Sequence, residues 1–186
     1  MHEIKLFAII TACLTLAQSA DACTGITLKS KDGATVVART MDWSGAENNS
    51  MYVVVPRGHN AQSLLPDGTM DGLSYTTLYG ISVQQPEFII DGTNEAGLSA
   101  ALFYFPNYGK YQEYNEANKD ISLADFQVVS WILSRFSSID QVKAAINDIR
   151  IINVDPSAST VHWRITEPSG RQVVLEIVDG RPNFYE

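Results

Sequence analysis

The stretch "CTGITLKSKDGATVVARTMDW", residues 23–43, decides how the chain begins to fold. It holds two runs, Thr24–Ser30 and Ala34–Asp42, in which apolar or β-branched residues alternate with small or polar ones. Such alternation predicts β-strands. The intervening "KDG" is typical of a tight turn. The stretch therefore predicts a β-hairpin that starts next to a cysteine.

The turn also predicts which residues of the hairpin lie opposite one another. If Asp32 and Gly33 are the two turn residues, paired residue numbers sum to 65, and Cys23 lies opposite Asp42. Directly opposed side chains are about 5 Å apart at Cβ, so a carboxylate would stand beside Cys23. Arg39 would then point to the other face of the hairpin. A bulge or a strong twist would be needed to aim it at Cys23.

Beyond this hairpin, the chain alternates between strand and helix patterns. The strand-like runs are Met51–Pro56, Phe88–Asp91, Leu98–Phe105, Thr160–Thr166 and Gln172–Val178, and the connections "GTNEAG" and "EPSG" join neighbouring runs as hairpins. The order of strands, then helices, then strands predicts an α+β fold of layered sheets and helices.

Two helices are predicted between these strands. In "SLADFQVVSWILSRF", residues 122–136, Ser122 is the expected cap and Asp125 lies in the first turn. Apolar residues recur there at helical spacing, namely Phe126, Val129, Leu133 and Phe136. A shorter helix follows from about Ile139, with Ser138 as its cap.

Residues 1–22 have the layout of a secretory signal peptide. Lys5 precedes an apolar stretch from Leu6 to Leu16, which is too short for a bilayer core that needs about 20 residues. Ala20 and Ala22 supply the small residues of a cleavage site, which places the cut directly before Cys23. We therefore expect an exported protein, periplasmic or secreted, whose mature domain spans residues 23–186.

A lipoprotein anchor on Cys23 is the alternative interpretation. Such sites usually carry a leucine-like residue three positions before the cysteine, whereas this chain has Ala20 there and the charged Asp21 next, so the local pattern opposes the anchor. A disulfide has no partner, because Cys13 lies inside the removed segment. A single remaining thiol in an exported protein indicates a reactive residue.

Composition excludes several classes of function. The 186 residues carry 13 basic and 21 acidic side chains, and removal of residues 1–22 leaves 12 and 19, a formal charge of −7. So acidic a chain does not suit nucleic acid or an anionic membrane surface. With 45% hydrophobic residues and no linker-like segment, the mature part is expected to be one globular unit.

An amino-terminal cysteine combines two catalytic groups in one residue. Its thiolate is a nucleophile, and its α-amine, with a pKa of about 7.7–8.0, can act as a general base. The Arg39 guanidinium would favour the thiolate, and Asp42 would hold the ammonium by charge-assisted hydrogen bonds. Taken alone, "RTMD" is more typical of a surface ion pair, and its coincidence with Cys23 reverses that preference. Serine-hydrolase and metal-site patterns are absent, and His59 and His162 stand apart from any such motif.

Three segments resemble the choloylglycine hydrolase family, the amino-terminal-nucleophile amidases that include penicillin V acylases and conjugated bile salt hydrolases. They are residues 23–43, "DGTNEAGLSAALFYFP" at 91–106, and "STVHWRITEPSGRQVVLEIVDGRPNFYE" at 159–186. The resemblance implies an αββα four-layer sandwich. It also implies that Cys23 is the nucleophile and that Arg39 and Asp42 are its partners in the active site.

The resemblance extends to the substrate side of the site. Tyr104 matches a position that supplies an oxyanion-hole group, as tyrosine does in several penicillin V acylases, although an aromatic in an alternating strand is otherwise expected to be packed in the core. Met41, Trp43 and Phe103 are the expected substrate-binding residues. The implied substrate is a small amide with an apolar acyl group, such as penicillin V, a conjugated bile salt or an acyl-homoserine lactone, cleaved without a cofactor.

Length is where this sequence departs from the family. Family members continue well past this length, so that a second oxyanion asparagine and a later active-site arginine map onto no position, and only the N-terminal half of the fold is expected. Full-length members are expected to allow a homotetramer. The alternatives are an inactive truncated member of the family and a lipid-anchored binding module.

Overall fold

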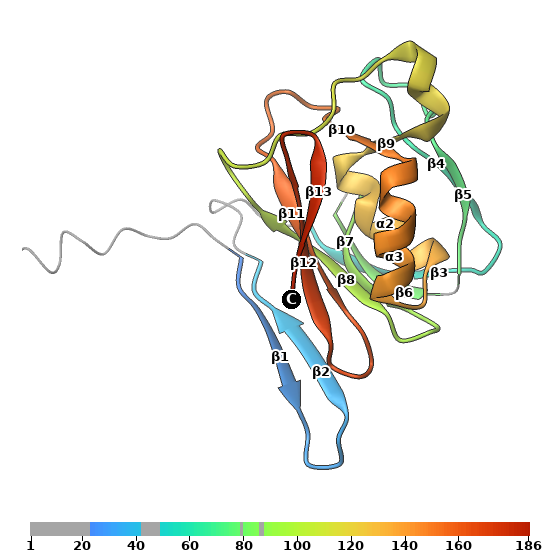
Figure 1. Cartoon of the computed structure of the whole chain (residues 1–186). Helices are drawn as coiled ribbons and strands as arrows, with labels where there is room; N and C mark the ends of the chain where they lie inside the picture. Colours follow the sequence, from blue (N-terminus) through green and yellow to red (C-terminus); the bar gives the residue numbers. More distant parts are fainter. Residues whose placement is uncertain (1–22, 42–48, 79, 86–87) are drawn as a thin grey trace, which may run out of the picture.

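A computed structural model describes residues 23–41, 49–78, 80–85 and 88–186, without the side chains of residues 84 and 85 (Figure 1). The predicted signal peptide, Asp42 and Trp43 lie outside the described residues. At the centre is a seven-stranded antiparallel sheet of order β13-β12-β11-β8-β7-β6-β3. Its strands are β3 (Met51–Val55), β6 (Gly80–Gln85), β7 (Phe88–Asn94), β8 (Ser99–Tyr104), β11 (Val161–Thr166), β12 (Gln172–Val178) and β13 (Arg181–Tyr185).

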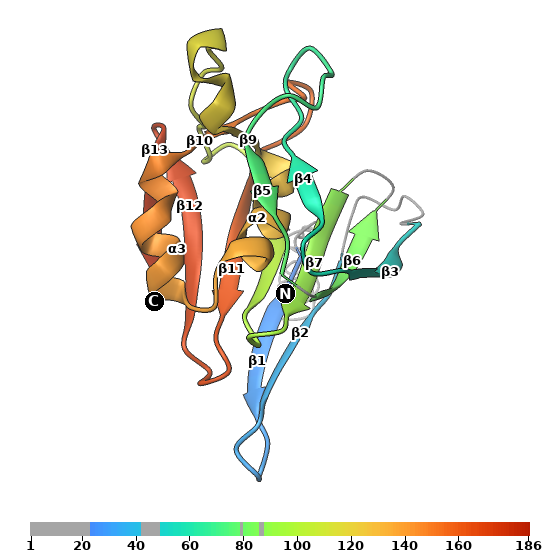
Figure 2. The same ribbon diagram turned by 90° about the vertical axis from the view of Figure 1, so that its right-hand side faces the viewer.

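One face of this sheet is covered by helices α2 (Val128–Arg135) and α3 (Ile139–Ala145), as Figures 1 and 2 show. Alternate residues of β11 and β12 point into the core beneath them, and Trp163 and Leu175 are fully buried there. Trp131 of α2 is buried in the same cluster. The residues that form the core under the helices are therefore the alternate apolar residues of the strands that the sequence predicted.

Short elements connect these layers. They are β4 (Asn60–Gln62), β5 (Ser74–Thr76), β9 (Ser122–Ala124), β10 (Arg150–Ile152) and the 3₁₀ turns η1 (Glu116–Ile121), η2 (Asp125–Gln127) and η3 (Ile146–Asp148). Strand β9 pairs in parallel with β10, and β4 pairs with β5. No helix within the described part of the chain is long and apolar enough to cross a membrane.

The two predicted helix starts differ in outcome. Ser138 does cap α3, because its hydroxyl accepts a hydrogen bond from the Gln141 N–H. The prediction that Ser122 caps the preceding helix is wrong. Ser122 belongs to β9, opposite Arg150, and its hydroxyl donates to the Asn118 carbonyl. Tertiary strand pairing has overridden the local cap pattern, and the α-helix begins only at Val128.

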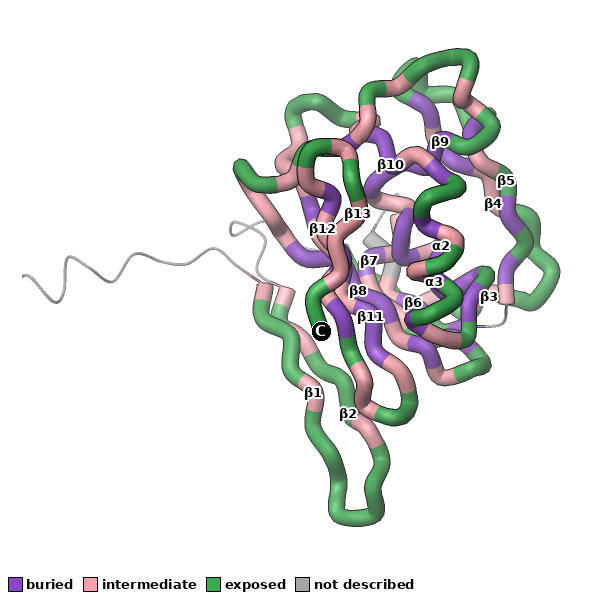
Figure 3. Tube along the Cα trace, viewed as in Figure 1, coloured by how far each residue is buried: buried purple, intermediate pink, exposed green. Residues whose placement is uncertain are grey.

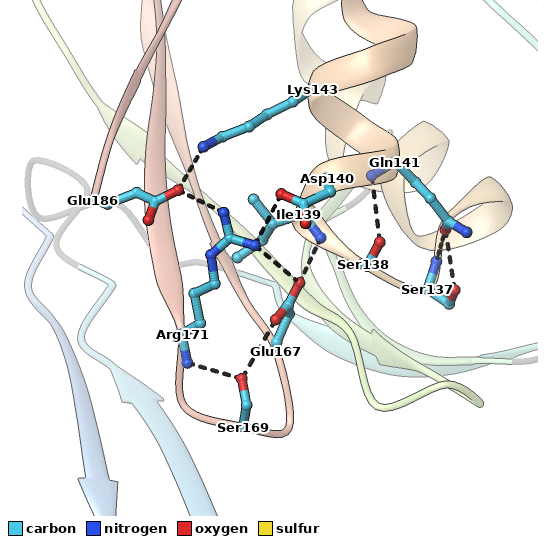
Figure 4. A network of polar contacts seen from close by, with 10 residues as sticks. All are labelled: Ser137, Ser138, Ile139, Asp140, Gln141, Lys143, Glu167, Ser169, Arg171 and Glu186. Carbon is cyan, nitrogen blue, oxygen red and sulfur yellow. Dashed lines mark hydrogen bonds and ion pairs between the residues drawn. The ribbon is translucent and has the colours of Figure 1, made fainter.

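A polar network fastens α3 to the edge of the sheet (Figure 4). The Arg171 guanidinium donates to the carboxylates of Asp140, 2.9 Å away, and Glu186, 2.6 Å away. Glu167 accepts from the Ile139 N–H at the start of α3. The β11–β12 turn, the end of β13 and the first turn of α3 are thus tied together by charge-assisted bonds.

The predicted hairpin is formed by β1 (Gly25–Lys29) and β2 (Thr35–Arg39), on the side of the sheet away from the helices (Figure 1). Its predicted register is wrong by one residue, because Gly25 pairs with Arg39 and paired numbers sum to 64. The loop has three residues, closed by hydrogen bonds between Ser30 and Ala34 and between Gly33 and Ser30. Gly33 has φ 89°, a conformation that glycine adopts readily and that accommodates the extra loop residue.

Candidate active site

The corrected register places Arg39 and Cys23 on the same face of the hairpin. Arg39 lies opposite Gly25, and residues two apart on a strand share a face. The ladder continues toward Cys23, since the Thr40 N–H donates to the Thr24 carbonyl over 2.8 Å. A one-residue shift of register turns every side chain to the other face. The bulge that the predicted register required in β2 is therefore unnecessary.

Arg39 reaches from the hairpin onto the sheet and is nearly buried there. Its Nη1 donates to the Leu102 carbonyl over 2.7 Å, and its guanidinium carbon lies 4.5 Å from the centre of the Phe103 ring. Its Nε donates to the Thr40 carbonyl and lies 4.0 Å from Oδ2 of Asp91. One cation is thus held by two carbonyls, an aromatic face and a carboxylate.

Cys23 and Arg39 line a small apolar cavity of about 20 Å³. The other lining residues are Met41, Phe88, Ile90, Leu102, Tyr104 and Phe126. Cys23 is half-buried and its thiol is free. The structure therefore brings together four of the residues predicted for the site, which are Cys23, Arg39, Met41 and Tyr104.

Four of the lining residues were not predicted as part of the site. Phe88 and Phe126 stack with ring centres 4.6 Å apart and form one wall. Phe126 had been expected on the apolar face of a helix, but it lies in η2, before the helix begins. Ile90 lies where β7 changes register against β6, between the pairs Gln84–Ile89 and Val83–Asp91. Such irregularities re-aim side chains next to functional sites.

The predicted substrate-side residues separate into two groups. Tyr104 lines the cavity, and its hydroxyl lies 3.0 Å from Oγ of Ser159. Phe103 is on the other face of β8, beneath Arg39, and is absent from the lining of the Cys23 cavity. It borders instead a larger cleft of about 340 Å³ between the hairpin and the sheet.

Charged side chains are gathered in this larger cleft. Arg39, Asp91 and Arg164 all line it. Burial raises the pKa of the Asp91 carboxyl, while the positive charges of Arg39 and Arg164 oppose that rise. Arg164 donates to Oγ1 of Thr27 and, over 3.0 Å, to Oε1 of Gln172, so it ties the hairpin to the sheet.

His162 is packed close to the site without facing the Cys23 cavity. Its ring stacks on Phe105 with centres 4.7 Å apart, and Nδ1 lies 3.4 Å from Glu176. Burial lowers the pKa of His162, and Glu176 partly offsets this. Among the residues that the structure describes, no three His, Cys, Asp or Glu side chains gather as a metal ion would require.

Comparison with known proteins gives consistent matches. The family model described as linear amide C-N hydrolases, choloylglycine hydrolase family, matches residues 23–186. The bile salt hydrolase/transferase of Clostridium perfringens (strain 13 / Type A) is 29% identical over 174 residues, covering 88% of this chain and 50% of the relative. That of Lactiplantibacillus plantarum is 27% identical over 165 residues, covering 85% and 48%.

Solved structures agree with these matches. A mutant conjugated bile acid hydrolase from Clostridium perfringens superimposes with a TM-score of 0.71 at 25% identity, covering 88% of this chain and 50% of that one. Penicillin V acylase from Agrobacterium tumefaciens also gives 0.71, at 20% identity, covering 87% and 48%. These matches confirm the predicted α+β, amino-terminal-nucleophile hydrolase fold. The chain spans about half the length of these relatives, and it belongs to the choloylglycine hydrolase family of linear amide C-N hydrolases.

Proposed function

We propose that the protein is an exported amidohydrolase in which cleavage before Cys23 creates an amino-terminal nucleophile. The observation that carries the proposal is the pairing of Cys23 with a nearly buried Arg39 at one apolar cavity. The family match begins at this same cysteine. The layout of residues 1–22 supports export to the periplasm or the medium.

The reaction follows from the two groups of Cys23. The thiolate attacks the amide carbonyl carbon, a C–S bond forms, and the carbonyl oxygen becomes an oxyanion. As the oxyanion collapses, the C–N bond breaks and the α-ammonium gives its proton to the leaving amine. Water then attacks the thioester and transfers a proton to the neutral α-amine. The carboxylic acid leaves, and the thiolate and the ammonium are restored.

The surroundings of Cys23 favour an apolar acyl group. Met41 and the stacked rings of Phe88 and Phe126 line the cavity, and Tyr104 stands at its edge as the proposed oxyanion-hole residue. Asp42 and Trp43, which lie outside the described residues, remain predicted members of the site. Related proteins include conjugated bile acid hydrolases and a penicillin V acylase, so we propose conjugated bile salts, phenoxyacyl penicillins or acyl-homoserine lactones as candidate substrates.

The test uses the protein at the length that its gene encodes. We expect release of glycine from glycocholate or of phenoxyacetate from penicillin V, and a loss of at least about 10³-fold in Cys23→Ala. Cys23→Ser is the isosteric comparison, and Glu95→Gln, which removes a surface partner of Arg57, is the matched control with unchanged rates. Unchanged hydrolysis in Cys23→Ala would refute the proposed nucleophile. Diacylglycerol on Cys23 would instead indicate an anchored, non-catalytic protein.

A further inference from the structure

Asp91 is the acidic partner of the arginine beside Cys23. It lies on β7, on the side of the sheet that faces the hairpin, and its Oδ2 is 4.0 Å from Nε of Arg39. The side chains of Arg39 and Asp91 are only 9% and 27% exposed. Charges withdrawn from water to this degree interact more strongly than an exposed pair. The ion pair of Arg39 and Asp91 is therefore expected to be stronger than an ion pair on the surface.

The other contacts of Arg39 do not fix its position as a charged partner would. The Leu102 and Thr40 carbonyls and the Phe103 ring are neutral, and they restrain Nη1, Nε and one face of the guanidinium without supplying a negative charge. Asp91 supplies the negative charge on the Nε side. A guanidinium that is held at Nη1, on one face and on its Nε side can adopt only one orientation. Its positive charge is therefore fixed in place before the reaction begins.

The backbone explains why Asp91 stands at this point. Strand β7 changes register immediately before it, between Ile89 and Asp91. Ile90, in the irregular position, lines the Cys23 cavity, whereas Asp91 lines the larger cleft with Arg39 and Arg164. The same change of register therefore places Ile90 in the apolar wall of the Cys23 cavity and Asp91 next to Arg39.

We propose that Asp91 is a positioning residue, which holds the Arg39 guanidinium beside Cys23 and affects the thiol only through Arg39. The catalytic consequence rests on the proposed function, whereas the placement of Arg39 does not. Arg164 also interacts electrostatically with Asp91, but its guanidinium is bound to Thr27 and Gln172, so it does not replace Arg39 as the group that Asp91 orients.

A double-mutant cycle tests this inference on protein that begins at Cys23. The four proteins are the wild type, Asp91→Asn, Arg39→Met and the double variant, and two rates are measured for each. One is hydrolysis of glycocholate and penicillin V, and the other is alkylation of Cys23 by iodoacetamide, located by peptide mass. We expect Asp91→Asn to lower kcat about tenfold with KM nearly unchanged, and to slow alkylation.

The cycle decides whether Asp91 acts through Arg39. In the Arg39→Met background, Asp91→Asn should change either rate by less than about twofold, because the group it positions is gone. Equal effects in both backgrounds would overturn the inference. Faster alkylation in Asp91→Asn would also overturn it, because Arg39 would then stay in place without Asp91. Coupling in alkylation with no hydrolysis by the wild type would refute the proposed function and leave the positioning role standing.

Two further variants and one spectrum complete the test. Asp91→Glu keeps the charge and should recover a large part of both rates, while Glu95→Gln should change neither. If Arg39→Met does not fold, the NMR signal of the Arg39 Nε–H in the wild type is followed as pH is lowered from 7 to 3. It should shift in a single titration that Asp91→Asn abolishes, and a signal independent of pH would overturn the inference.

Discussion

The two faces of the seven-stranded sheet contrast in what covers them. The face toward α2 and α3 is closed by large apolar side chains, with Trp131, Trp163 and Leu175 almost without solvent contact. On the opposite face lies the β1–β2 hairpin, most of which is exposed in Figure 3, with Leu28 56% exposed. Charged groups and the Cys23 cavity are found on or beside this hairpin.

This contrast separates the interactions that stabilise the fold from the interactions that position the side chains of the candidate site. On the helix side, burial of apolar side chains supplies most of the stabilisation. On the hairpin side, hydrogen bonds and ion pairs place single side chains, such as Arg39 on the Leu102 carbonyl and Arg164 on Thr27. Substitutions on the first face should therefore change stability, and substitutions on the second should change reactivity.

The largest effect that we expect is a loss of stability, and a pair of matched leucine-to-alanine substitutions, one on each face, tests it. Leu175→Ala removes a fully buried side chain of β12 and should lower the free energy of unfolding by about 2–5 kcal/mol. Leu28→Ala on β1 should change it by less than about 0.5 kcal/mol. Urea unfolding of this chain measures both. Equal losses would remove the contrast between the two faces.

Hydrogen bonds should show the same contrast with a smaller effect. Asn94 is buried, donates to the carbonyls of Leu133 and Phe136 at the C-terminal end of α2, and accepts from the Leu98 N–H. Asn94→Ala leaves these groups unpaired and should cost about 2–3 kcal/mol. Thr35→Val on the hairpin removes two exposed hydrogen bonds, one donated to the Pro168 carbonyl and one accepted from Lys29, and should cost under about 1 kcal/mol. A cost for Thr35→Val equal to that of Asn94→Ala in thermal melts would contradict the account.

The pH dependence of stability should have opposite signs on the two sides. Burial raises the pKa of Asp125, the first residue of η2, to about 7. Between about pH 4 and 7 only the unfolded state loses this proton, so stability should fall by about 1.4 kcal/mol per pH unit as pH rises, and then level off. Asp125→Asn should abolish that slope. A wild type and variant with parallel pH profiles in urea unfolding would show that Asp125 ionises normally.

Asp32, in the hairpin loop, supplies the comparison. A hydrogen bond from Ser30 holds its pKa below the ordinary value. Its small contribution is therefore present above about pH 4 and is lost as pH falls through its lowered pKa. Asp32→Asn should remove a stabilisation at neutral pH, whereas Asp125→Asn should remove a destabilisation. Effects of the same sign in the two variants at pH 7 would contradict this assignment.

The smallest effect on stability is expected for the ion pair of Arg171 and Glu186, at the edge of the sheet. Hydrogen bonds from Arg171 and Lys143 lower the pKa of Glu186 to about 2, so its contribution is lost as pH falls from about 4.5 to 2. Arg171→Met should lower the melting temperature only slightly, and 1 M salt should erase the difference. A difference that persists in salt would show that Arg171 acts by packing instead.

Sequence patterns predicted most of the sheet and part of the site. The runs from Phe88, Leu98, Thr160 and Gln172 are strands, and "GTNEAG" and "EPSG" join neighbours as expected. Strand β6 and strand β13, which contains Pro182, were not predicted, because pairing with neighbours rather than local alternation defines them.

The wrong or missing predictions at the site have physical causes that cannot be read from local sequence patterns. The register of the hairpin depended on whether Lys31 joins Asp32 and Gly33 in the loop, and that single residue decides whether Arg39 lies on the same face as Cys23. Phe103 was grouped with Tyr104, but neighbours on a strand point to opposite faces. Asp91 and Ile90 depend on an irregular pairing between β6 and β7, which only the tertiary structure reveals.

The central claim is that Cys23 becomes a free amino-terminal nucleophile. The measurement that tests it most directly is the intact mass and amino-terminal sequence of the protein recovered after export by its own host. The account predicts a chain that starts at an unmodified Cys23, with both its thiol and its α-amine open to reagents. A chain that retains residues 1–22 would leave the proposed mechanism without its base, and a chain that carries a lipid on the Cys23 sulfur would leave it without its nucleophile; either result would contradict the account.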